Sequence, residues 1–506
     1  MNLTLTHLFA ILPMVIVGIT VVVVMLSVAW RRNHMLNATL SGIGLVLALL
    51  SVFWVWHSGS SLAASGMGFP TPVTPMLIVD GYSLFYSALI LIGALACNIF
   101  AFSYLEGLKE HRDEFYLLLL CSTLGALVLA SSIHMASLFV GLELMSVALY
   151  GMAAYTFQQR MSLEAGIKYM VLSAVASAFL LFGMALLFAA YGVLDFAGLG
   201  LRLVFSDSVN VWTLIGVGMM VIGLGFKLSI VPFHMWTSDV YEGAPAPVSA
   251  FLATVSKVSV FAVFVRFVMM VPTFSLKLSV IVGIIAVLSM LAGNLLALKQ
   301  RNVKRLLAYS SIAHMGYLLS VIVAMRAGVT NGNGHISMGG HLVMETTALY
   351  LVAYVLTSLG GFGVVSLCSS PYLGEEAGHI NQLRGLYWRR PVLAVFMAFM
   401  LLSLAGIPLT AGFIGKFYVL ALDMNDGLWW LVGAVIIGSA IGLYYYLRTM
   451  VALFQPESPE TIHAPVGKGQ AVGALTVGVA AVLTLIVGIY PQPLIHLAQI
   501  ALPVGF

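Results

Sequence analysis

Four charged residues lie deep inside long apolar runs of the sequence, where an ionised side chain is costly. They are Glu143 in SLFVGLELMSVALYG, Lys227 in GLGFKLSIVPFHMW, Lys257 in FLATVSKVSVFAVF and Lys416 in SLAGIPLTAGFIGKFYVL. Insertion scales assign roughly +2.5 to +3.5 kcal/mol to such a residue at the centre of a membrane helix, so four unpaired charges facing lipid would cost on the order of 10–14 kcal/mol. We therefore expect them to face protein or water, where amines and carboxylates bind and release protons.

Each of the four also has a purely structural explanation. For Glu143 the alternative, weaker than a functional role, is a carboxylate that is hydrogen-bonded to a neighbouring helix. Lys227 is close to a predicted loop and could extend its ammonium group to the aqueous surface. The same explanation is weaker for Lys257, which lies far from either loop, and for Lys416, which lies in mid-span.

Three further charges in apolar runs have less specific positions. Lys168 follows Glu164 by one helical turn, so an ion pair on one helix face explains it as well as a role in proton transfer. Arg266 lies near the outer end of its run, and we expect it to extend to the surface. Glu345 lies near the start of its run. It is either a gate residue or a carboxylate that is solvated at the outer surface.

Two histidines are candidate relay residues. His234 follows Pro232, and His314 lies in SSIAHMGYLL. A lone histidine in a helix is more often a packed core residue, but a neutral imidazole can both accept and donate a proton. Lys168, His234 and His314 are therefore secondary candidates beside the four central charges.

The composition dictates the elements that must position these residues. Of the 506 residues, 61% are hydrophobic and 8% are charged, whereas soluble domains carry roughly 25% charged residues. A soluble protein is thereby excluded. At about 20 residues per crossing, we expect an all-α polytopic membrane protein of about fourteen helices. The predicted spans are 8–30, 37–57, 81–104, 115–132, 134–157, 165–192, 211–233, 247–271, 276–298, 305–327, 343–369, 391–423, 427–453 and 471–490.

Two of these spans carry helix breakers beside a central lysine. Pro232 follows Lys227, and Gly406, Pro408 and Gly412 precede Lys416. Broken helices at corresponding places in two halves of a chain indicate the transport site of an inverted-repeat transporter. We therefore predict two inverted five-helix repeats, helices 4–8 and 9–13, with broken helices 7 and 12. Lys227 and Lys416 would then occupy matching places.

This interpretation divides the chain into four parts. Residues 1–114 form an N-terminal three-helix segment, 115–271 the first repeat, 272–454 the second repeat, and 455–506 the C-terminal helix 14. Connections 370–390 and 454–470 are linkers, and 378–388 is predicted as a short interfacial helix.

Loop charges predict the orientation. The loops after odd-numbered spans carry 14 Lys and Arg residues and the loops after even-numbered spans carry 3. By the positive-inside rule the odd-numbered loops face the cytoplasm, and both termini face outward. The cationic residues of the odd-numbered loops are Arg31, Arg32, Lys109, Arg112, Arg160, Lys299, Arg301, Lys304, Arg305, Arg384, Arg389, Arg390, Arg448 and Lys468.

The sequence contains none of the motifs that bind a nucleotide, haem or iron–sulfur cluster. The three cysteines show no C-x-x-C spacing, so we predict no metal site. We also predict no cofactor-binding residues, and no partner among nucleic acids. Redox chemistry and nucleotide hydrolysis must therefore come from other chains.

Three internal stretches resemble a known family. GFKLSIVPFHMWTSDVYEGAPAPVSAFLATVSK (225–257), GNLLALKQRNVKRLLAYSSIAHMGYLL (293–319) and LAGIPLTAGFIGKFYVLALD (404–423) are similar to motifs of the antiporter-like membrane subunits of respiratory complex I. Multisubunit Na+/H+ antiporters and membrane-bound hydrogenases share these motifs. LPMVIVGITVVVVMLSVAWRRNHMLNAT near the start and VGAVIIGSAIGLYYYLR further resemble the N-type subunit of bacterial NADH:quinone oxidoreductase.

The resemblance implies specific roles. The family's fifth-helix glutamate falls on Glu143, its seventh- and eighth-helix lysines on Lys227 and Lys257, and its twelfth-helix residue on Lys416. It implies a subunit of a translocase in the bacterial inner membrane. NADH, FMN, iron–sulfur clusters and quinone would then bind in partner subunits, and the membrane neighbours would include M- and K-type subunits.

These residues suggest how protons would move. A carboxylate 4 Å from a lysine favours the ammonium form by about 4 kcal/mol at an effective dielectric constant of 20. Movement of Glu143 relative to Lys227 would therefore hold or release a proton, which would pass through water and His314 to Lys257 and Lys416. The alternatives are a subunit of a Na+/H+ antiporter or hydrogenase, and a spacer of the membrane arm that transports nothing.

Overall fold

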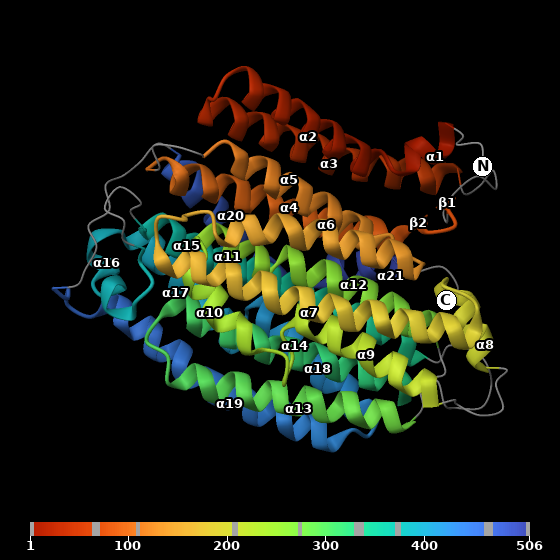
Figure 1. Ribbon diagram of the computed structural model, residues 1–506. Helices are drawn as coiled ribbons and strands as arrows, with labels where there is room; N and C mark the ends of the chain where they lie inside the picture. Colours follow the sequence, from red (N-terminus) through yellow and green to blue (C-terminus); the bar gives the residue numbers. More distant parts are fainter. Residues whose placement is uncertain are drawn as a thin grey trace.

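The apolar runs form long helices that lie side by side in one bundle (Figure 1). The structure, a computed structural model, describes residues 5–62, 71–107, 112–204, 211–271, 276–327, 338–369, 376–459 and 469–501. Within these ranges, 12 helices are long and apolar enough to cross a membrane. Shorter apolar helices at Glu114–Ala130 and Pro391–Ala405 fall in the predicted fourth and twelfth spans. The prediction of an all-α polytopic membrane protein is confirmed.

The N-terminal segment forms one edge of the bundle (Figure 1). It comprises α1 (Leu5–Ala10), α2 (Leu12–Trp30), α3 (His34–Leu62) and α4 (Gly81–Leu105). A small antiparallel hairpin of β1 (Thr71–Thr74) and β2 (Leu77–Val79) precedes α4 and was not predicted. The first predicted span is divided because Pro13 lies in the first turn of α2, where a missing N–H costs nothing.

The predicted first repeat contains α5 to α12. Their bounds are α5 (Glu114–Ala130), α6 (Met135–Ala153), α7 (Arg160–Tyr191), α8 (Phe196–Val204), α9 (Val211–Leu228), α10 (Met235–Gly243), α11 (Ala246–Ala253) and α12 (Val255–Met270). The short helix α8 was not predicted.

The predicted second repeat and the C-terminal part contain the remaining helices. Their bounds are α13 (Leu276–Leu298), α14 (Val303–Ala327), α15 (Met338–Cys368), the 3-10 helix Ile380–Leu383, α16 (Leu386–Arg389), α17 (Pro391–Ala405), α18 (Ala411–Asn425), α19 (Trp429–Phe454), α20 (Gln470–Ile489) and α21 (Gln492–Ile500). The predicted interfacial helix at 378–388 is therefore a 3-10 turn followed by one short helix.

The core of the bundle runs through three spans near its centre. The apolar stretch Ala246–Met270 is 100% buried, and Val303–Met325 and Leu342–Cys368 are each 94% buried, whereas the outer helix Leu12–Trp30 is 22% buried. Lys257 and His314 therefore lie on two of the three most enclosed spans. In Figure 1, α12 and α14 lie between α2 and α3 at one edge and α13 and α19 at the other.

Both predicted helix breaks are present. The first separates α9 from α10 around Pro232, and the second separates α17 from α18 at 406–410. The eighth span is also interrupted, at Thr254, between α11 and α12. No breaker residue in the sequence marked this third interruption.

Small residues bring the helices close around the candidate residues. A side chain at Gly125 of α5 would lie 2.5 Å from the backbone nitrogen of Met145 and 2.7 Å from the carbonyl oxygen of Gly141, both on α6. Such close approach is typical of membrane helix packing. It fixes α6, and with it Glu143, against α5.

Arg266 does not extend to the surface, so that expectation was wrong. Its guanidinium is fully buried and pairs with Asp80 through two hydrogen bonds, Nη1–Oδ2 at 2.8 Å and Nη2–Oδ1 at 2.9 Å. Asp80 also caps α4 through Ser83. Arg266 does lie near the helix end, as expected. Its guanidinium pairs with the carboxylate of Asp80, in the N-terminal segment, and does not extend to water. The pair joins α4 to α12, and we call it the Asp80–Arg266 clamp.

The clamp also perturbs the ionisation of Asp80. Burial raises the pKa of this carboxyl, but the Arg266 guanidinium and the hydrogen bonds from Ser83 outweigh it and hold the pKa below its ordinary value of 3.8. Asp80 is therefore charged in the folded protein at physiological pH, and the clamp is a buried ion pair.

The structure tests only part of the predicted orientation of the chain. Helices α1 and α21 lie at the same end of the bundle, opposite α16 (Figure 1), as an even number of crossings requires. Lys109, Lys468 and both chain ends lie outside the described residues. The assignment of that end to the outer side remains a prediction.

Candidate functional site

Lys227 is held by hydroxyl groups from two neighbouring helices. Its side chain is buried, and its Nζ donates hydrogen bonds to Ser146 Oγ of α6 at 2.6 Å and to Ser173 Oγ of α7 at 2.5 Å. The amine therefore does not reach the aqueous surface. Serine hydroxyls accept from an ammonium group and can equally donate to a neutral amine, so both protonation states of Lys227 can be accommodated.

Glu143 lies beside this lysine without touching it. Its carboxylate accepts a hydrogen bond from Ser177 of α7, one turn beyond Ser173. The ion pairs of the described residues do not include Glu143 with Lys227, yet the carboxylate acts electrostatically on the amine. The contact with Ser177 is also what a purely structural carboxylate would make. The arrangement is a carboxylate and an amine separated by two serines on one helix face.

The break after Lys227 leaves polar backbone groups that the surroundings satisfy. Ser229 has a positive φ of 62°, and the Phe226 carbonyl accepts from the Trp236 indole N–H at 3.0 Å. Across the break, Ser289 Oγ of α13 accepts from the Val231 N–H at 3.0 Å. Non-helical backbone at this depth is tolerated because it is buried in protein.

Lys257 lies in the middle of the buried core. It is fully buried and donates a hydrogen bond to Ser311 Oγ of α14. The interruption at Thr254 precedes it by three residues, so Lys257 lies in the first turn of α12. The hydrogen bond connects the predicted first repeat to the predicted second.

His314 continues this polar line on α14. It lies one turn beyond Ser311, and its Nδ1 is 2.6 Å from the hydroxyl oxygen of Tyr350. It acts electrostatically with both Lys257 and Lys416, so both lysines lie near its imidazole ring. The sequence-based choice of His314 as a relay candidate is consistent with this position.

Lys416 is held by the backbone of its own broken helix. Its Nζ donates to the carbonyl oxygens of Leu404 at 2.9 Å and Ala405 at 3.0 Å, the last residues of α17. These carbonyls have no helical partner because Gly406 turns the chain away with φ of 87°. Lys416 itself belongs to α18, beyond the break, whereas Lys227 precedes its break. The two lysines therefore do not occupy matching places relative to the breaks.

A small cavity joins His314 to the second break. It has a volume of about 10 Å³ and is lined by His314, Tyr350, Tyr354, Ser403 and Leu404, among others. The exposed lining of this cavity is apolar, so it offers a water molecule no polar partners.

Three other candidate residues, unlike His314, lie at the periphery. Lys168 pairs with Glu164 at 2.7 Å, the contact that one of its two explanations required, and also with Asp239 of α10 at 2.8 Å. His234 is half-buried at the start of α10, and no hydrogen bond of the described residues joins it to the central lysines. Glu345 accepts from Gln499 of α21 at the surface. Their roles remain predictions.

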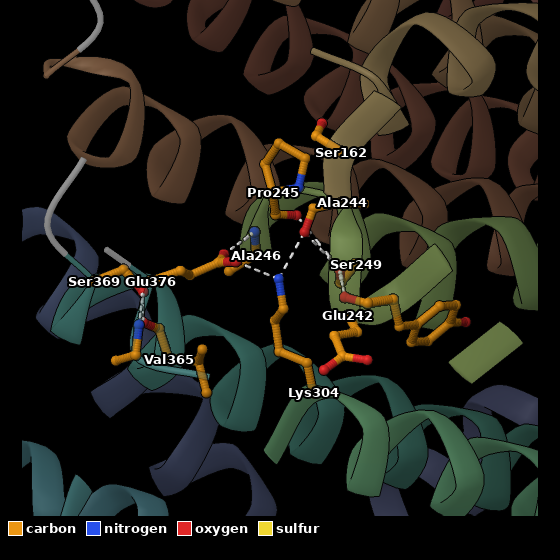
Figure 2. Close-up of polar contacts among 12 residues, drawn as sticks. Ser162, Glu242, Ala244, Pro245, Ala246, Ser249, Lys304, Val365, Ser369 and Glu376 are labelled. Atoms are coloured by element: carbon orange, nitrogen blue, oxygen red, sulfur yellow. Dashed lines mark hydrogen bonds and ion pairs between the residues drawn. The ribbon is translucent and has the colours of Figure 1, made fainter. Parts of the chain in front are cut away.

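A second buried ion pair lies at the end of the bundle that contains α16. Figure 2 shows Lys304 of α14 reaching between the Ala244 carbonyl, at 2.7 Å, and the carboxylate of Glu376. The other oxygen of Glu376 accepts from the Ala246 N–H at 2.8 Å, the first N–H of α11. The pair therefore staples the turn between α10 and α11 to the segment after α15. The sequence placed Lys304 in a loop, where it only contributed to orientation.

Sequence reasoning missed the hydroxyl groups that hold the charged side chains. The available signal was the repetition of serines one turn apart, Ser173 with Ser177 on α7, in an otherwise apolar run. It also missed Asp423, which is fully buried on α18 and was counted only as the end of a span. Single polar residues in an apolar helix are frequent, so their partners become visible only when the helices pack.

The chain matches the family model of the NADH:quinone oxidoreductase/Mrp antiporter membrane subunit over residues 132–442. It belongs to this family. The matched region begins before α6 and ends within α19, so it contains Glu143, Lys227, Lys257, His314 and Lys416.

Solved structures of similar proteins extend the likeness to nearly the full length. A chain of respiratory complex I from Thermus thermophilus is 32% identical, with a TM-score of 0.78, and the match covers 96% of this chain and 99% of that one. A chain of an archaeal membrane-bound sulfane sulfur reductase is 22% identical, with a TM-score of 0.80 over 98% and 96%. A chain of the Mrp complex from Dietzia sp. DQ12-45-1b is 18% identical, with a TM-score of 0.79 over 98% and 97%. The reductase and Mrp chains show that this chain shares their fold.

The protein is thus an antiporter-like, multi-pass membrane subunit of the kind found in multisubunit membrane complexes. The three similar chains come from three different complexes, so the fold alone does not distinguish among them.

Proposed function

We propose that this chain is the N-type membrane subunit of a bacterial proton-translocating NADH:quinone oxidoreductase. It would lie in the inner membrane with both termini in the periplasm, beside M- and K-type subunits. The observation that carries the proposal is a line of buried amines, Lys227, Lys257 and Lys416, each hydrogen-bonded to groups that tolerate both protonation states or to open peptide carbonyls. The 32% identity to a complex I chain over 96% of the sequence supports the choice of complex.

The first step would occur between Glu143 and Lys227. A carboxylate near a buried amine favours the ammonium form, and its withdrawal favours release of the proton. Ser146 and Ser173 hold Lys227 from α6 and α7, so a shift of α6 would move Glu143 and one of these hydroxyls together. Moving one charge against 100 mV requires about 2.3 kcal/mol, and the change in a charge pair of this kind is comparable.

The released proton would continue along α14. Lys257 contacts Ser311, His314 follows one turn later, and the cavity beside His314 leads to the peptide groups that hold Lys416. A neutral imidazole accepts a proton at one nitrogen and donates from the other. Lys416 would then discharge the proton toward the periplasm.

The driving energy would come from redox chemistry in partner subunits. NADH, FMN, iron–sulfur clusters and quinone would bind there, and this chain would contribute to the enzyme as a translocase subunit. Its task is to convert a signal from those subunits into a change of protonation along the lysine line.

Membrane vesicles containing the complete complex test the proposal. Lys227→Ala should depress NADH-driven proton pumping and quinone reduction together, by roughly tenfold or more, since a positioned proton-transfer group contributes about 10²–10⁴-fold. The matched control is Lys299→Met, because Lys299 is an exposed lysine at the end of a helix. Equal pumping in the Lys227 variant and the wild type, at equal subunit content, would refute the proposal.

The subunit list of the purified complex separates the rival functions. Co-purification with NADH- and quinone-binding subunits supports the oxidoreductase. Their absence, together with Na+-dependent and redox-independent exchange in vesicles, would assign the chain to a Na+/H+ antiporter, and hydrogenase subunits would assign it to that class. Tolerance of neutral replacements at all four central charges would indicate a spacer.

A further inference from the structure

Asp423 is a buried carboxyl that the proton path described above does not use. It lies in the last turn of α18, and its exposed fraction is 0%. Among the described residues, neither carboxylate oxygen has a hydrogen-bond donor. Its polar neighbour is Ser320 of α14, but the Ser320 hydroxyl donates to the Tyr317 carbonyl at 2.8 Å and has no second proton to give.

Such a carboxyl has no structural purpose that the contacts reveal. A buried polar group without a hydrogen bond destabilises the fold by about 1–3 kcal/mol. The Asp80–Arg266 clamp shows the contrast, because there every carboxylate oxygen is paired. An orphaned carboxyl is instead ready to take up a proton, since the protonated form is the one that low polarity favours.

Asp423 lies in line with Lys416. Both belong to the buried face of α18, which also contains Gly415, Val419 and Leu422. They are seven residues apart, which corresponds to two helical turns, or about 10 Å along the axis. A proton would therefore need an intervening water to pass between them.

The facing helix carries polar groups over the same stretch. Ser311, His314, Tyr317 and Ser320 recur at every third residue of α14. Ser311 contacts Lys257, His314 acts electrostatically with both lysines, Tyr317 lies under the Lys416 ammonium at 5.6 Å, and Ser320 neighbours Asp423. This stripe follows the proposed path and continues beyond Lys416 to Asp423.

Asp423 is also next to the end of the helix. Met424 and Asn425 are exposed, and α18 ends at Asn425. By the predicted orientation this end faces outward. Asp423 is therefore buried itself, but the residues that follow it at the end of α18 are exposed.

We propose that Asp423 is the proton-exit group of this chain, acting after Lys416. The proposal rests on the proposed function. The Lys416 ammonium loses a proton through a water molecule, and an O–H bond forms on the Asp423 carboxylate, leaving a neutral amine and a carboxylic acid. The acid then gives that proton to outer water, which regenerates the carboxylate.

Proton pumping by the complete complex in NADH-energised vesicles tests the inference. Asp423→Asn, which keeps the shape and removes the titratable oxygen, should reduce pumping severalfold at unchanged subunit content, and Asp423→Glu should retain most of it. Asp426→Asn is the matched control, because Asp426 lies three residues further on and is partly exposed; its pumping should equal that of the wild type.

Lys416→Met, measured in parallel, separates the two claims. Reduced pumping in Lys416→Met with normal pumping in Asp423→Asn would overturn the role of Asp423 and leave the proposed function standing. Normal pumping in both would overturn both.

Infrared difference spectra give a second measurement that does not depend on the Asn variant. A carboxylic-acid C=O band should change during turnover of the wild type and shift in Asp423→Glu. A band that is the same in both proteins would overturn the inference.

Discussion

The two helix breaks hold their lysines in opposite ways. Lys227 lies just before its break and donates to the side chains Ser146 and Ser173 on two other helices. Lys416 lies after its break and donates to the carbonyls of Leu404 and Ala405 in the preceding half of its own span. The first lysine depends on the relative position of separate helices, whereas the second depends on the turn of one chain segment.

This difference suggests that the two breaks have different roles in proton transfer. A lysine held between helices responds when one helix moves, and Glu143 lies on one of those helices. A lysine held by open carbonyls keeps its place while neighbouring helices shift. We therefore expect the first break to receive the driving signal and the second to act as a fixed step toward the outlet.

The largest effect is expected from removing the charge beside the first break. Glu143→Gln should reduce NADH-driven proton pumping by roughly tenfold or more, because the neutral amide no longer acts on Lys227. Glu114→Gln is the control, since that carboxylate is partly exposed at the start of α5 and pairs with Arg32. Pumping near the wild-type level in Glu143→Gln would mean that the first break does not receive the signal.

The second prediction concerns a buried charge that belongs to neither break. Arg266→Gln should lower the free energy of unfolding by about 3–5 kcal/mol, because it leaves Asp80 buried without its partner. Thermal unfolding of the purified complex measures this. Pumping per assembled complex should stay unchanged. A loss of pumping without a loss of stability would place Arg266 on the proton path.

The clamp also has a defined pH dependence. The folded pKa of Asp80 lies below 3.8, because the Arg266 charge and the Ser83 hydrogen bonds outweigh the effect of burial. Its contribution to stability is therefore complete above that pH and is lost only as the pH falls below it, toward the lowered pKa.

Loss of one hydroxyl at the first break should have an intermediate effect. Ser173→Ala removes a hydrogen bond to the Lys227 ammonium, and such bonds contribute about 1.5–3 kcal/mol. We expect lower pumping with assembly retained. Ser279→Ala is the control, because Ser279 lies near the start of the outer helix α13. Equal losses in the two variants would contradict the specific role of Ser173.

The turn at the second break gives a related, smaller effect. Gly406 has φ of 87°, and an added Cβ would meet Lys416 Cδ at 3.0 Å. Gly406→Ala should therefore destabilise the chain by about 1–3 kcal/mol. The same change at Gly433, which has open space around it and no positive φ, should not destabilise it. If Gly406→Ala keeps wild-type stability and pumping, the backbone does not fix Lys416.

Much of the architecture followed from simple patterns. Apolar runs predicted the spans because a membrane helix must bury about 20 residues and satisfy its own backbone. Pro232 and Gly406 predicted the two breaks for the same reason. The hairpin at 71–79 and the interruption at Thr254 were not predicted, since neither carries a pattern strong enough to override the surrounding apolar sequence.

The site was predictable only in part. An ionisable residue in an apolar run stands out by its cost, so Glu143 and the central lysines were found. Arg266 was misplaced because its partner, Asp80, lies 186 positions earlier in the chain. The serines around Lys227 were missed because a serine in an apolar helix carries only a small free-energy cost. Its sequence position therefore does not indicate a site until its partner is known.

The sequence by itself determined that the chain spans a membrane many times, that two of its helices break, and which charges are costly enough to need an explanation. Only the tertiary structure decided the partners: hydroxyls from two helices for Lys227, open carbonyls for Lys416, and, in the part of the chain that the structure describes, no hydrogen-bond donor for Asp423. The physical reason is that burial cost depends on local composition, whereas a hydrogen bond depends on which distant segments pack together.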